Sequence, residues 1–574
     1  MQYRDLIYPM WFKGIGLNHK GVQNMKILGL DTETVNGKPM TIQLASRDTV
    51  EIIFVNEKNV TEKFVELIRK YVTTKFRTAV FCHNYKDFDL GILFFPYWEQ
   101  LANDEGFEIK GRGWKLKGRV TGTPFAELSM GKNRTVIFYD SMSFFQMGLD
   151  RLAKSMNVGE KKPKPKLLGK KKYTHKDKKF IDYAVNDAVI QHGVGEQIFK
   201  YHEKYDVQMS LSIAQLAERI FRHQFLNKPW PSLPDYLNYF CLRSYHGGKN
   251  GMYVKPGMYK NVNYYDIKSA YPWAMYQLPD FDDESGSWYE VKELVKEHFG
   301  IYKITGTIKD CLYPVCFTDN FKKQVGKGEV YLTSPEVFSA LKHKELKIDH
   351  IEGLIFAEKN RMEIMFNNEK DTEKTSFQKF IDHFYELKNQ TPKEDPNYIF
   401  YKIILNSLYG KFIQMVKVSG DVFDLDNYKH VGKKYKVGQM FNPFIASLIT
   451  GLVRAKMHDL EHKYKALHVA TDSIMTKEVI KKELGENLGD LALEFSGDAL
   501  LLRNKLYVLF DKKKEIKKYA LHGFHSNIEK LMELYNRKGH EYTYNHMTKI
   551  KESIKQKIHP FQMIQKKANL HLDL

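Results

Sequence analysis

Cysteine is scarce in this chain, which has four in 574 residues. Cys82, Cys241, Cys311 and Cys316 are too few and too scattered for a disulfide framework or for a metal site of paired cysteines. We therefore expect reduced thiols with structural roles.

Long apolar runs are also missing. A transmembrane helix needs about 20 consecutive apolar residues, and no such run occurs. The opening residues, MQYRDLIYPMWFKG, place charged and aromatic residues where a secretory signal needs an uninterrupted apolar stretch. We expect no membrane association and a cytoplasmic location, which would be the host cytoplasm if the chain is viral.

Negative charge is in deficit. The chain has 89 Lys and Arg against 69 Asp and Glu, a formal net charge of +20. This surplus favours a polyanionic partner such as nucleic acid. Charge alone leaves open a merely solvated basic surface or an anionic membrane surface, but the sequence has no basic amphipathic anchor for the latter.

The first 207 residues alternate between strand and helix patterns, which predicts an α/β domain. Strands are expected at 26–35, 41–46, 51–55 and 78–84, and helices at 60–72, from 89 and at 180–199. Residues 159–179 hold ten Lys and two Pro, so we expect an exposed basic loop there. The Lys-rich stretches 511–518 and 548–557 have a helical pattern suited either to backbone phosphates or to a solvated face.

Four carboxylates and a tyrosine form the first candidate site. Asp31 and Glu33 share one face of a predicted strand, Asp89 follows another strand, and Tyr183 and Asp187 lie one helical turn apart. Carboxylates of this kind can hold two divalent ions, which activate a water and stabilise the leaving oxygen in phosphodiester hydrolysis.

This set resembles the three motifs of the DEDDy 3′→5′ proofreading exonucleases. The resemblance makes Asp31, Glu33, Asp89 and Asp187 metal ligands and gives Tyr183 the task of orienting the attacking water. Residues 139–142, YDSM, are similar to the family's primer-strand motif, with Met142 where Leu is usual. Thr34, Asn84, Phe88 and Ser141 would then hold the single-stranded 3′ end, although Phe88 could equally be a core aromatic. Lys166 is our guess for a catalytic lysine.

A second group of motifs follows in the chain. Residues 264–272, YYDIKSAYP, resemble motif A of family B DNA polymerases, with Asp266 as metal ligand and Tyr271 against the sugar. Residues 402–410, KIILNSLYG, resemble motif B and put Lys402, Asn406 and Tyr409 on one helical face for the nucleotide. Lys388 is a weaker nucleotide-binding candidate, because a solvated lysine is its simpler interpretation.

Residues 468–474, HVATDSI, resemble motif C, with Ala470 in place of the family's first Asp. Asp266 and Asp472 still supply the two carboxylates that a two-metal transfer needs. Tyr245, Gly247 and Gly248 are similar to the family's YxG(G/A) motif, and Lys505 and Tyr507 to its KxY motif, so both would contact DNA.

The order of these motifs, with long segments between A and B and between B and C, resembles protein-primed family B polymerases of small phages and linear plasmids. That resemblance implies an α/β and α+β multidomain fold, in which an RNase H-like exonuclease domain precedes a right-hand polymerase with two insertions. The expected divisions are an exonuclease domain at 1–207, palm at 208–277, a TPR1-like insertion at 278–375, fingers at 376–411, a TPR2-like insertion at 412–440, palm at 441–526 and thumb at 527–574.

The expected activity is DNA-directed DNA polymerisation with 3′→5′ proofreading, which uses two Mg²⁺ or Mn²⁺ ions in each active site. Primer–template DNA, dNTPs and a terminal protein as primer are the implied partners of a monomeric enzyme. Two alternatives stay open. One is a repair polymerase of the same family, with or without a primer, and the other is a catalytically weakened nucleic-acid-binding relative, which Ala470 would favour.

Overall fold

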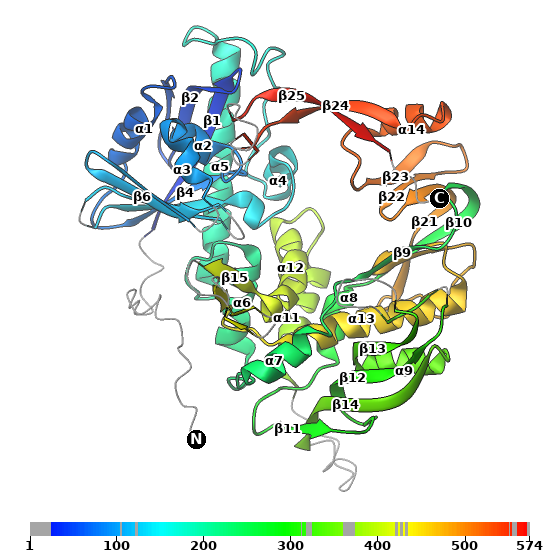
Figure 1. The fold of residues 1–574 in the computed structure, drawn as a ribbon. Helices are drawn as coiled ribbons and strands as arrows, with labels where there is room; N and C mark the ends of the chain where they lie inside the picture. The colour runs from blue at the N-terminus through cyan, green and yellow to red at the C-terminus, as the bar shows by residue number, and fades with distance from the viewer. Residues whose placement is uncertain are drawn as a thin grey trace.

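The computed structural model shows a chain built from several sheets joined by a central helical region (Figure 1). The residues it describes are 25–103, 106–120, 124–131, 133–311, 313–316, 324–359, 374–418, 423–424, 429–430, 434–549, 552–553 and 560–570. None of the helices in these ranges combines the length and apolar character needed to cross a membrane. The four cysteines all lie in described residues, and no disulfide joins them.

An eight-stranded sheet forms the first part of the chain, in the order β3-β2-β1-β4-β8-β7-β6-β5. Its strands are β1 (Met25–Val35), β2 (Lys38–Ala45), β3 (Val50–Phe54), β4 (Arg77–Cys82), β5 (Phe107–Gly111), β6 (Trp114–Arg119), β7 (Phe125–Ser129) and β8 (Thr135–Asp140). β4 pairs in parallel with β1 and β8, and the other pairs are antiparallel.

The helices around this sheet are α1 (Val60–Arg69), α2 (Asp89–Leu93), η1 (Phe95–Tyr97), α3 (Trp98–Leu101), η2 (Ser141–Ser143), α4 (Leu149–Ser155) and α5 (Lys178–Lys204). Gly29 allows α5 to approach β1 closely, because a Cβ at that position would lie 2.1 Å from the Ala188 carbonyl oxygen. This contact sets the functional residues of β1 against those of α5.

A seven-stranded antiparallel sheet has the order β23-β22-β21-β10-β20-β19-β9. Its strands are β9 (Lys249–Met252), β10 (Gly257–Ile267), β19 (His468–Thr471), β20 (Ser473–Thr476), β21 (Leu491–Arg503), β22 (Leu506–Phe510) and β23 (Ile516–Leu521). Segments about 200 residues apart in the sequence thus become neighbours, because β10 lies between β20 and β21.

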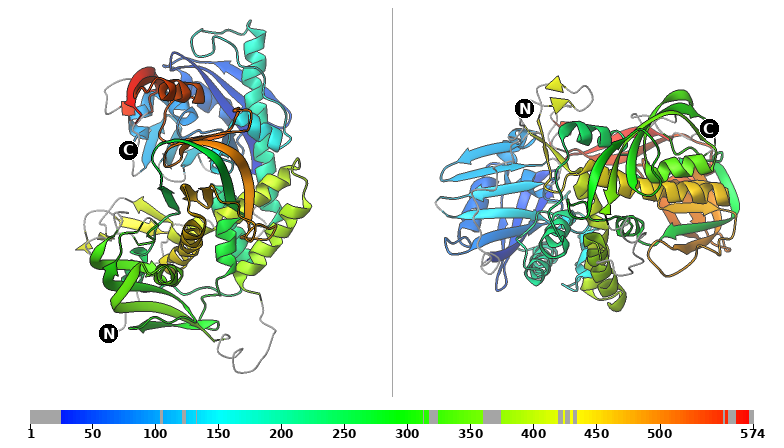
Figure 2. Two further views of the ribbon diagram at one scale, coloured as in Figure 1. Left: turned by 90° about the vertical axis from the view of Figure 1, so that its right-hand side faces the viewer. Right: turned by 90° about the horizontal axis from the view of Figure 1, so that it is seen from below.

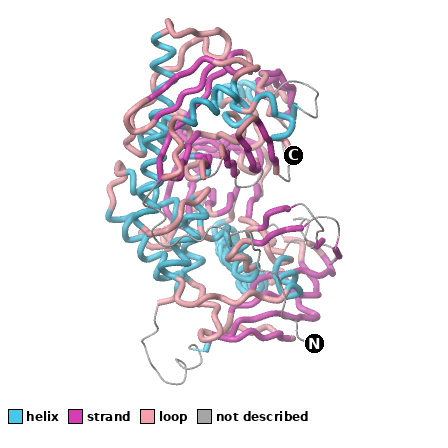
Figure 3. The backbone as a smooth tube through the Cα atoms, turned by 90° about the vertical axis from the view of Figure 1, so that its left-hand side faces the viewer, coloured by secondary structure: helices cyan, strands magenta, loops and turns pink. Residues whose placement is uncertain are grey.

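Helices connect the two sheets. They are α6 (Ile213–Ile220), η3 (Phe221–Phe225), α7 (Asp235–Leu242), α8 (Ala270–Tyr276), α11 (Ser376–Gln390), α12 (Pro396–Ser407), η4 (Tyr409–Ile413) and α13 (Pro443–Tyr464). Tyr201 of α5 stacks on Phe400 of α12 at 3.7 Å between ring centroids, which ties the first part of the chain to the helical region. In Figure 3 helices run along one edge and through the middle of the view, while strands lie toward both ends.

A separate four-stranded sheet packs beside α13, in the order β11-β14-β12-β13 (Figure 2). It contains β11 (Gly286–Val291), β12 (Phe299–Ile308), β13 (Gly326–Thr333) and β14 (Leu346–Glu358), with helix α9 (Ser334–Lys342) between the last two. Its own apolar core includes Tyr302, Ile304 and Val337.

Short hairpins complete the described chain. β15 (Met415–Val418) pairs with β18 (Lys434–Val437), and β16 (Phe423–Asp424) pairs with β17 (Lys429–His430). After α14 (Ile528–Asn536), the hairpin of β24 (Glu541–Met547) and β25 (Met563–Asn569) extends toward the first sheet (Figure 1). Lys549 Nζ lies 2.8 Å from Asp87 Oδ2, and the Phe88 and Phe561 ring centroids are 5.4 Å apart.

Two local expectations were wrong. Residues 511–518 do not form a helix: Asp511 accepts hydrogen bonds from the backbone N–H groups of Lys513 and Glu515, which makes a turn that leads into β23. The other Lys-rich stretch, 548–557, lies mostly outside the described residues. Tyr409 does not continue the helix of Lys402 either, because α12 ends at Ser407 and a 3₁₀ turn begins at Tyr409.

Candidate active sites

The first carboxylate group lies where β1, α2 and α5 meet. Asp31 and Glu33 project from β1, and Asp89 is the first residue of α2. Thr32 Oγ1 donates a hydrogen bond of 2.6 Å to Asp89 Oδ1, which holds α2 against the strand. Asp187 comes from α5, the helix that Gly29 admits against β1. The structure therefore brings together the four carboxylates that the sequence pattern singled out.

Burial and mutual repulsion raise the pKa values of this group. Burial, with neighbouring Glu33, Asp89 and Asp187, raises the pKa of Asp31 well above its usual range. The pKa of Glu33 rises to about 8, first through burial and then through Asp187, and burial raises that of Asp89 to about 7. Oδ1 of Asp187 is buried, and no hydrogen bond to this oxygen is found among the described residues. A cluster of this kind fits hard divalent cations, which offset the repulsion and satisfy such oxygens.

Lys161 is a site residue that sequence reasoning missed. Its Nζ lies 2.8 Å from Asp187 Oδ2 and 5.6 Å from the centre of the Tyr183 ring. Lys166, the lysine guessed from the sequence, is exposed. Because the loop contains ten lysines, the sequence gave no basis for choosing which one lies in the site. The choice depends on how the loop is anchored, for instance by the 2.7 Å hydrogen bond from Asn36 N–H to the Gly169 carbonyl.

The four residues expected to hold a 3′ end lie around this site but differ in exposure. Thr34 is half-buried on β1. Asn84 has a positive φ of 64°, and its backbone N–H donates a hydrogen bond to Asp140 Oδ1. Ser141 is fully buried, and its Oγ donates to the Cys82 carbonyl at 3.1 Å. Phe88 packs on Phe561 of the C-terminal region. The Ser141 hydroxyl is therefore already engaged within the protein.

The second carboxylate pair is assembled by the central strands of the seven-stranded sheet. Asp266 lies opposite Ser473 in the β10–β20 register, and Asp472 occupies the turn between β19 and β20. The Ile267 N–H donates to the Asp472 carbonyl at 2.9 Å, and Thr471 takes a positive φ of 65° to make the turn. The two carboxylates are thus adjacent across neighbouring strands.

Charge around Asp266 comes from several elements. Burial, then Asp472 and Glu494, raises its pKa to about 7, while Lys518 and Lys402 oppose the shift. Glu494 of β21 and Lys518 of β23 were not identified from the sequence, and no spacing links them to the motifs. Only the strand order places them beside Asp266, so the structure was needed to find them.

Aromatic and basic residues flank this pair. The rings of Tyr271 and Tyr409 stack at 4.0 Å between centroids, with 6° between their planes. Asn406 Nδ2 donates to the Lys402 carbonyl at 2.8 Å. Burial and the charges of Lys402 and Lys268 lower the pKa of Lys388, so these three lysines gather on one side of the site. Such a cluster suits a triphosphate.

The remaining predicted DNA contacts surround the β19–β20 turn. A Cβ on Gly248 would lie 2.5 Å from Thr471 Cγ2, so only glycine fits there, and Gly247 has open space. Lys505 Nζ lies 3.4 Å from Thr471 Oγ1. Burial raises the pKa of Tyr245, and the nearby Tyr409 raises it further. Tyr507 is buried, with its ring 6.3 Å from that of Tyr264.

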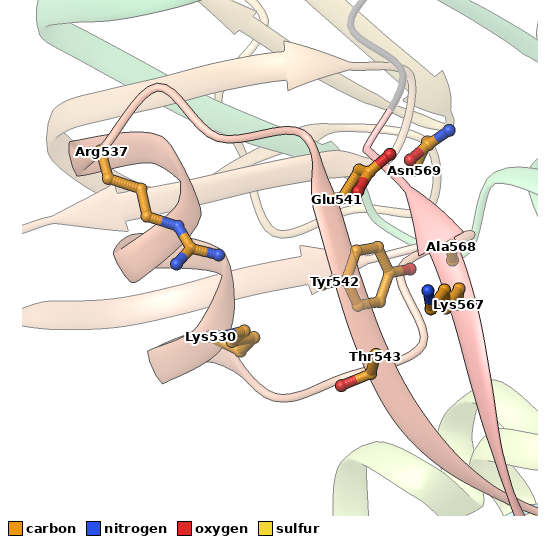
Figure 4. Close-up of a pocket in the computed structure, with 8 residues that line it drawn as sticks. All are labelled: Lys530, Arg537, Glu541, Tyr542, Thr543, Lys567, Ala568 and Asn569. Carbon is orange, nitrogen blue, oxygen red and sulfur yellow. The ribbon is translucent and has the colours of Figure 1, made fainter.

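A basic pocket lies apart from both carboxylate groups, between α14 and the β24–β25 hairpin (Figure 4). Lys530 and Arg537 face it from the helix side, and Tyr542 and Lys567 from the strands. Glu533 pairs with both helix cations, at 2.8 and 3.0 Å. Glu541 also lines the pocket, so acidic side chains compensate part of its positive charge.

Comparison with known proteins supports a polymerase relationship. The sequence model of DNA polymerases of type B, organellar and viral, matches residues 166–441. A probable DNA polymerase of Neurospora intermedia is 26% identical over 60% of this chain and 39% of its own length. The DNA-directed DNA polymerase of Enterobacteria phage PRD1 is 28% identical over 46% of this chain and 49% of its own. The chain thus spans less than half the length of these relatives.

A solved structure of Phi29 DNA polymerase, complexed with primer–template DNA and incoming nucleotide, has a similar fold. It aligns with a TM-score of 0.68 at 16% identity and covers 95% of this chain and 100% of its own. This likeness confirms the expected fold class, a mixed α/β multidomain architecture.

Proposed function

We propose that this chain, which is similar to organellar and viral type B DNA polymerases, is a DNA-directed DNA polymerase with a separate 3′→5′ proofreading exonuclease site. The observation that carries this proposal is the presence of two carboxylate groups on two different sheets. Asp266 and Asp472 meet across β10 and β19–β20, whereas Asp31, Glu33, Asp89 and Asp187 meet where β1, α2 and α5 join. Two separate carboxylate groups, each suited to divalent cations, can serve two opposed reactions, the synthesis and the hydrolysis of phosphodiester bonds.

In the proposed division of the chain, the first sheet and α5 make the exonuclease domain, 1–207. The seven-stranded sheet makes the palm, α11 and α12 the fingers, and the C-terminal α14 and hairpin the thumb. The four-stranded sheet lies in the proposed TPR1-like segment 278–375. The β15–β18 hairpin belongs to the proposed TPR2-like segment 412–440, part of which lies outside the described residues.

At the polymerase site, Asp266 and Asp472 would hold two Mg²⁺ or Mn²⁺ ions. Bound there, the ions would supply activation of the primer 3′-oxygen and stabilisation of the phosphates. Lys402, with Lys388 and Lys268 beside it, would bind the triphosphate of the dNTP. Tyr271, held flat by Tyr409, would exclude a ribose 2′-hydroxyl.

At the exonuclease site, Asp31, Glu33, Asp89 and Asp187 would hold the ions for hydrolysis. Lys161 would keep Asp187 in place through its 2.8 Å ion pair, and it lies over the ring of Tyr183. Tyr183 would then orient the attacking water. The sites are built from different residues, so each can be disabled alone.

We further propose that this chain begins DNA synthesis on a terminal protein, as the protein-primed polymerases that it resembles do. The two insertions, and a fold similar to a polymerase crystallised on primer–template DNA, support processive synthesis primed by a protein and able to displace a strand. A primer-dependent or primer-independent repair polymerase is the second candidate. Synthesis on a template without oligonucleotide, with and without a candidate terminal protein, separates these two.

The decisive experiment compares two variants of the full chain. Asp31→Ala with Glu33→Ala should lower degradation of a 5′-labelled single strand by orders of magnitude while primer extension stays within a few-fold. Asp472→Asn should abolish extension and leave degradation. Glu62→Gln, an exposed carboxylate on α1, is the control for charge removal. If either variant loses both activities while still folded, the two-site proposal is wrong.

A further inference from the structure

A buried histidine cluster joins α13 to the four-stranded sheet. His458 and His462 lie one turn apart on α13, and Glu345 lies between α9 and β14. Their three candidate ligand atoms lie within 4.8 Å of one another. In the described part of the chain, the groups with this geometry all use α13 histidines.

The hydrogen bonds of His458 point to a cation at its other nitrogen. Ser339 Oγ donates to Asp459 Oδ1 at 2.7 Å, so its lone pair accepts from His458 Nδ1, also at 2.7 Å. A neutral imidazole protonated at Nδ1 presents a lone pair at Nε2. That nitrogen lies 3.1 Å from Glu345 Oε2, an acceptor. Two acceptors face each other in a buried site, which requires a proton or a metal ion between them.

The dimensions favour a metal ion. His462 Nε2 lies 2.7 Å from Glu345 Oε1, and the Cys311 thiol donates a hydrogen bond to the same carboxylate. Ligand atoms around a tetrahedral zinc ion are about 3.4 Å apart, as follows from metal–ligand distances of about 2.1 Å. The cluster therefore needs only a small expansion to hold an ion.

Neighbouring side chains hold two of these candidate ligands in place. The Ser339 contact fixes the tautomer and ring orientation of His458, as outer partners do for ligating histidines. The ring of His343 stacks on that of His462 at 3.9 Å, with 7° between the planes. Glu345 and His458 are almost completely buried, and His462 is half-buried, so an ion could enter from one side.

We propose that Glu345, His458 and His462 bind a Zn²⁺-class transition-metal ion, and that this ion clamps the four-stranded sheet to α13. Imidazole ligands favour zinc-like ions over Mg²⁺, so this site is chemically distinct from both proposed catalytic sites. The alternative is a protonated network in which His458 is an imidazolium that bonds to Glu345.

Glutamine variants distinguish the metal site from the protonated network, because a Gln side chain can donate a hydrogen bond to Glu345 but is a poor zinc ligand. The full-length protein is loaded with Zn²⁺, dialysed against excess Mg²⁺ and measured for zinc by mass spectrometry. Wild type should retain one ion per chain, His462→Gln and His458→Gln should lose it, and His462→Cys should retain it. His350→Gln, an exposed histidine on β14, is the matched control and should behave as wild type.

Thermal unfolding gives a second readout. A zinc-selective chelator should lower the melting temperature of wild type and of His350→Gln but leave that of His462→Gln unchanged. If wild type holds no zinc after dialysis, or if His462→Gln holds as much as wild type, the proposal is overturned.

Discussion

Lys161 illustrates how much a single residue can depend on its surroundings. It is one of ten lysines in residues 159–179, and neither its type nor its spacing sets it apart. The fold places its ammonium group 2.8 Å from an oxygen of the buried Asp187 carboxylate. Its charge therefore acts inside the first site, while Lys166 faces solvent.

Replacing Lys161 should impair hydrolysis selectively. Lys161→Ala removes the cation that positions Asp187 and lies over Tyr183, so degradation of single-stranded DNA should fall on the order of a hundredfold. Lys166→Ala is the matched control and should degrade DNA like wild type. Rates would be measured on a 5′-labelled strand under single-turnover conditions. Equal losses in both variants would show that loop charge, rather than position, matters.

Asp266 gives a prediction on pH. Its pKa in the folded protein is about 7, against an ordinary value of 3.8, so between these values the folded state binds more protons than the unfolded state. The stability of the metal-free protein must therefore fall as pH rises through this range, and the cost is complete above about pH 7. Asp266→Asn removes this cost.

We therefore expect metal-free Asp266→Asn to melt at a higher temperature than wild type at pH 8, with the difference vanishing near pH 4. Addition of Mg²⁺ should stabilise wild type more than the variant, since the variant lacks the ligand. Asp349→Asn, an exposed carboxylate, serves as control. A lower melting temperature for Asp266→Asn at pH 8 would contradict the buried-charge interpretation.

Among the elements, α13 makes contacts that hold several parts together. Arg454, in its middle, is almost completely buried, and its Nε donates to Glu336 Oε1 of α9 at 2.7 Å. The same guanidinium donates to the Gly247 carbonyl at 3.1 Å, beside the loop that approaches Thr471. The helix thus links the four-stranded sheet to the edge of the proposed polymerase site.

Breaking this pair should be costly. Arg454→Met leaves Glu336 charged and buried without its partner, so the free energy of unfolding should drop by about 3–5 kcal/mol. Lys303→Met removes a partly exposed cation that pairs with Glu329 and Glu352, and should cost at most about 1 kcal/mol. Denaturant unfolding measures both. Adding Glu336→Leu to Arg454→Met should recover part of the loss, and a failure to do so would place the cost elsewhere.

At the scale of the whole molecule, segments far apart in the sequence meet. The β24–β25 hairpin reaches the first sheet through Lys549 with Asp87 and through Phe561 with Phe88 (Figure 1). The β15–β18 hairpin begins after Phe412 and ends before Met440, both of which are buried in the main core. Its base is therefore anchored, and its outer part can be removed.

Replacing residues 417–435 by a short glycine-containing turn keeps the Met415–Val437 and Val416–Lys436 pairs. If the hairpin helps to enclose DNA, product length under single-binding conditions and strand displacement should both fall, while single-nucleotide addition should stay near wild type. A variant of Lys436 alone, such as Lys436→Ala, controls for lost charge. Unchanged product lengths would argue against enclosure.

The fold class and the main carboxylates were predictable because they depend on local chemistry. Alternating apolar patterns mark the strands of the first sheet. Asp31, Glu33 and Asp266 lie on strands and Asp472 in a turn between two strands, all within short, ordered motifs. Misjudged segments were those where a side chain redirects the backbone. The Asp511 turn interrupted a helical pattern of lysines, and Tyr409 fell into a 3₁₀ turn beyond α12.

By itself, the sequence determined the chemical types at each site and their order along the chain, since motif residues lie within a few positions of one another. Tertiary structure alone decided which of many equivalent residues joined them. Lys161, Glu494, Lys518 and the pairing of Glu345 with His458 depend on contacts between segments far apart in the chain. Such contacts follow from the order of the strands and the packing of the helices. Both are set by the burial of apolar residues elsewhere in the chain, so no local sequence pattern encodes these contacts.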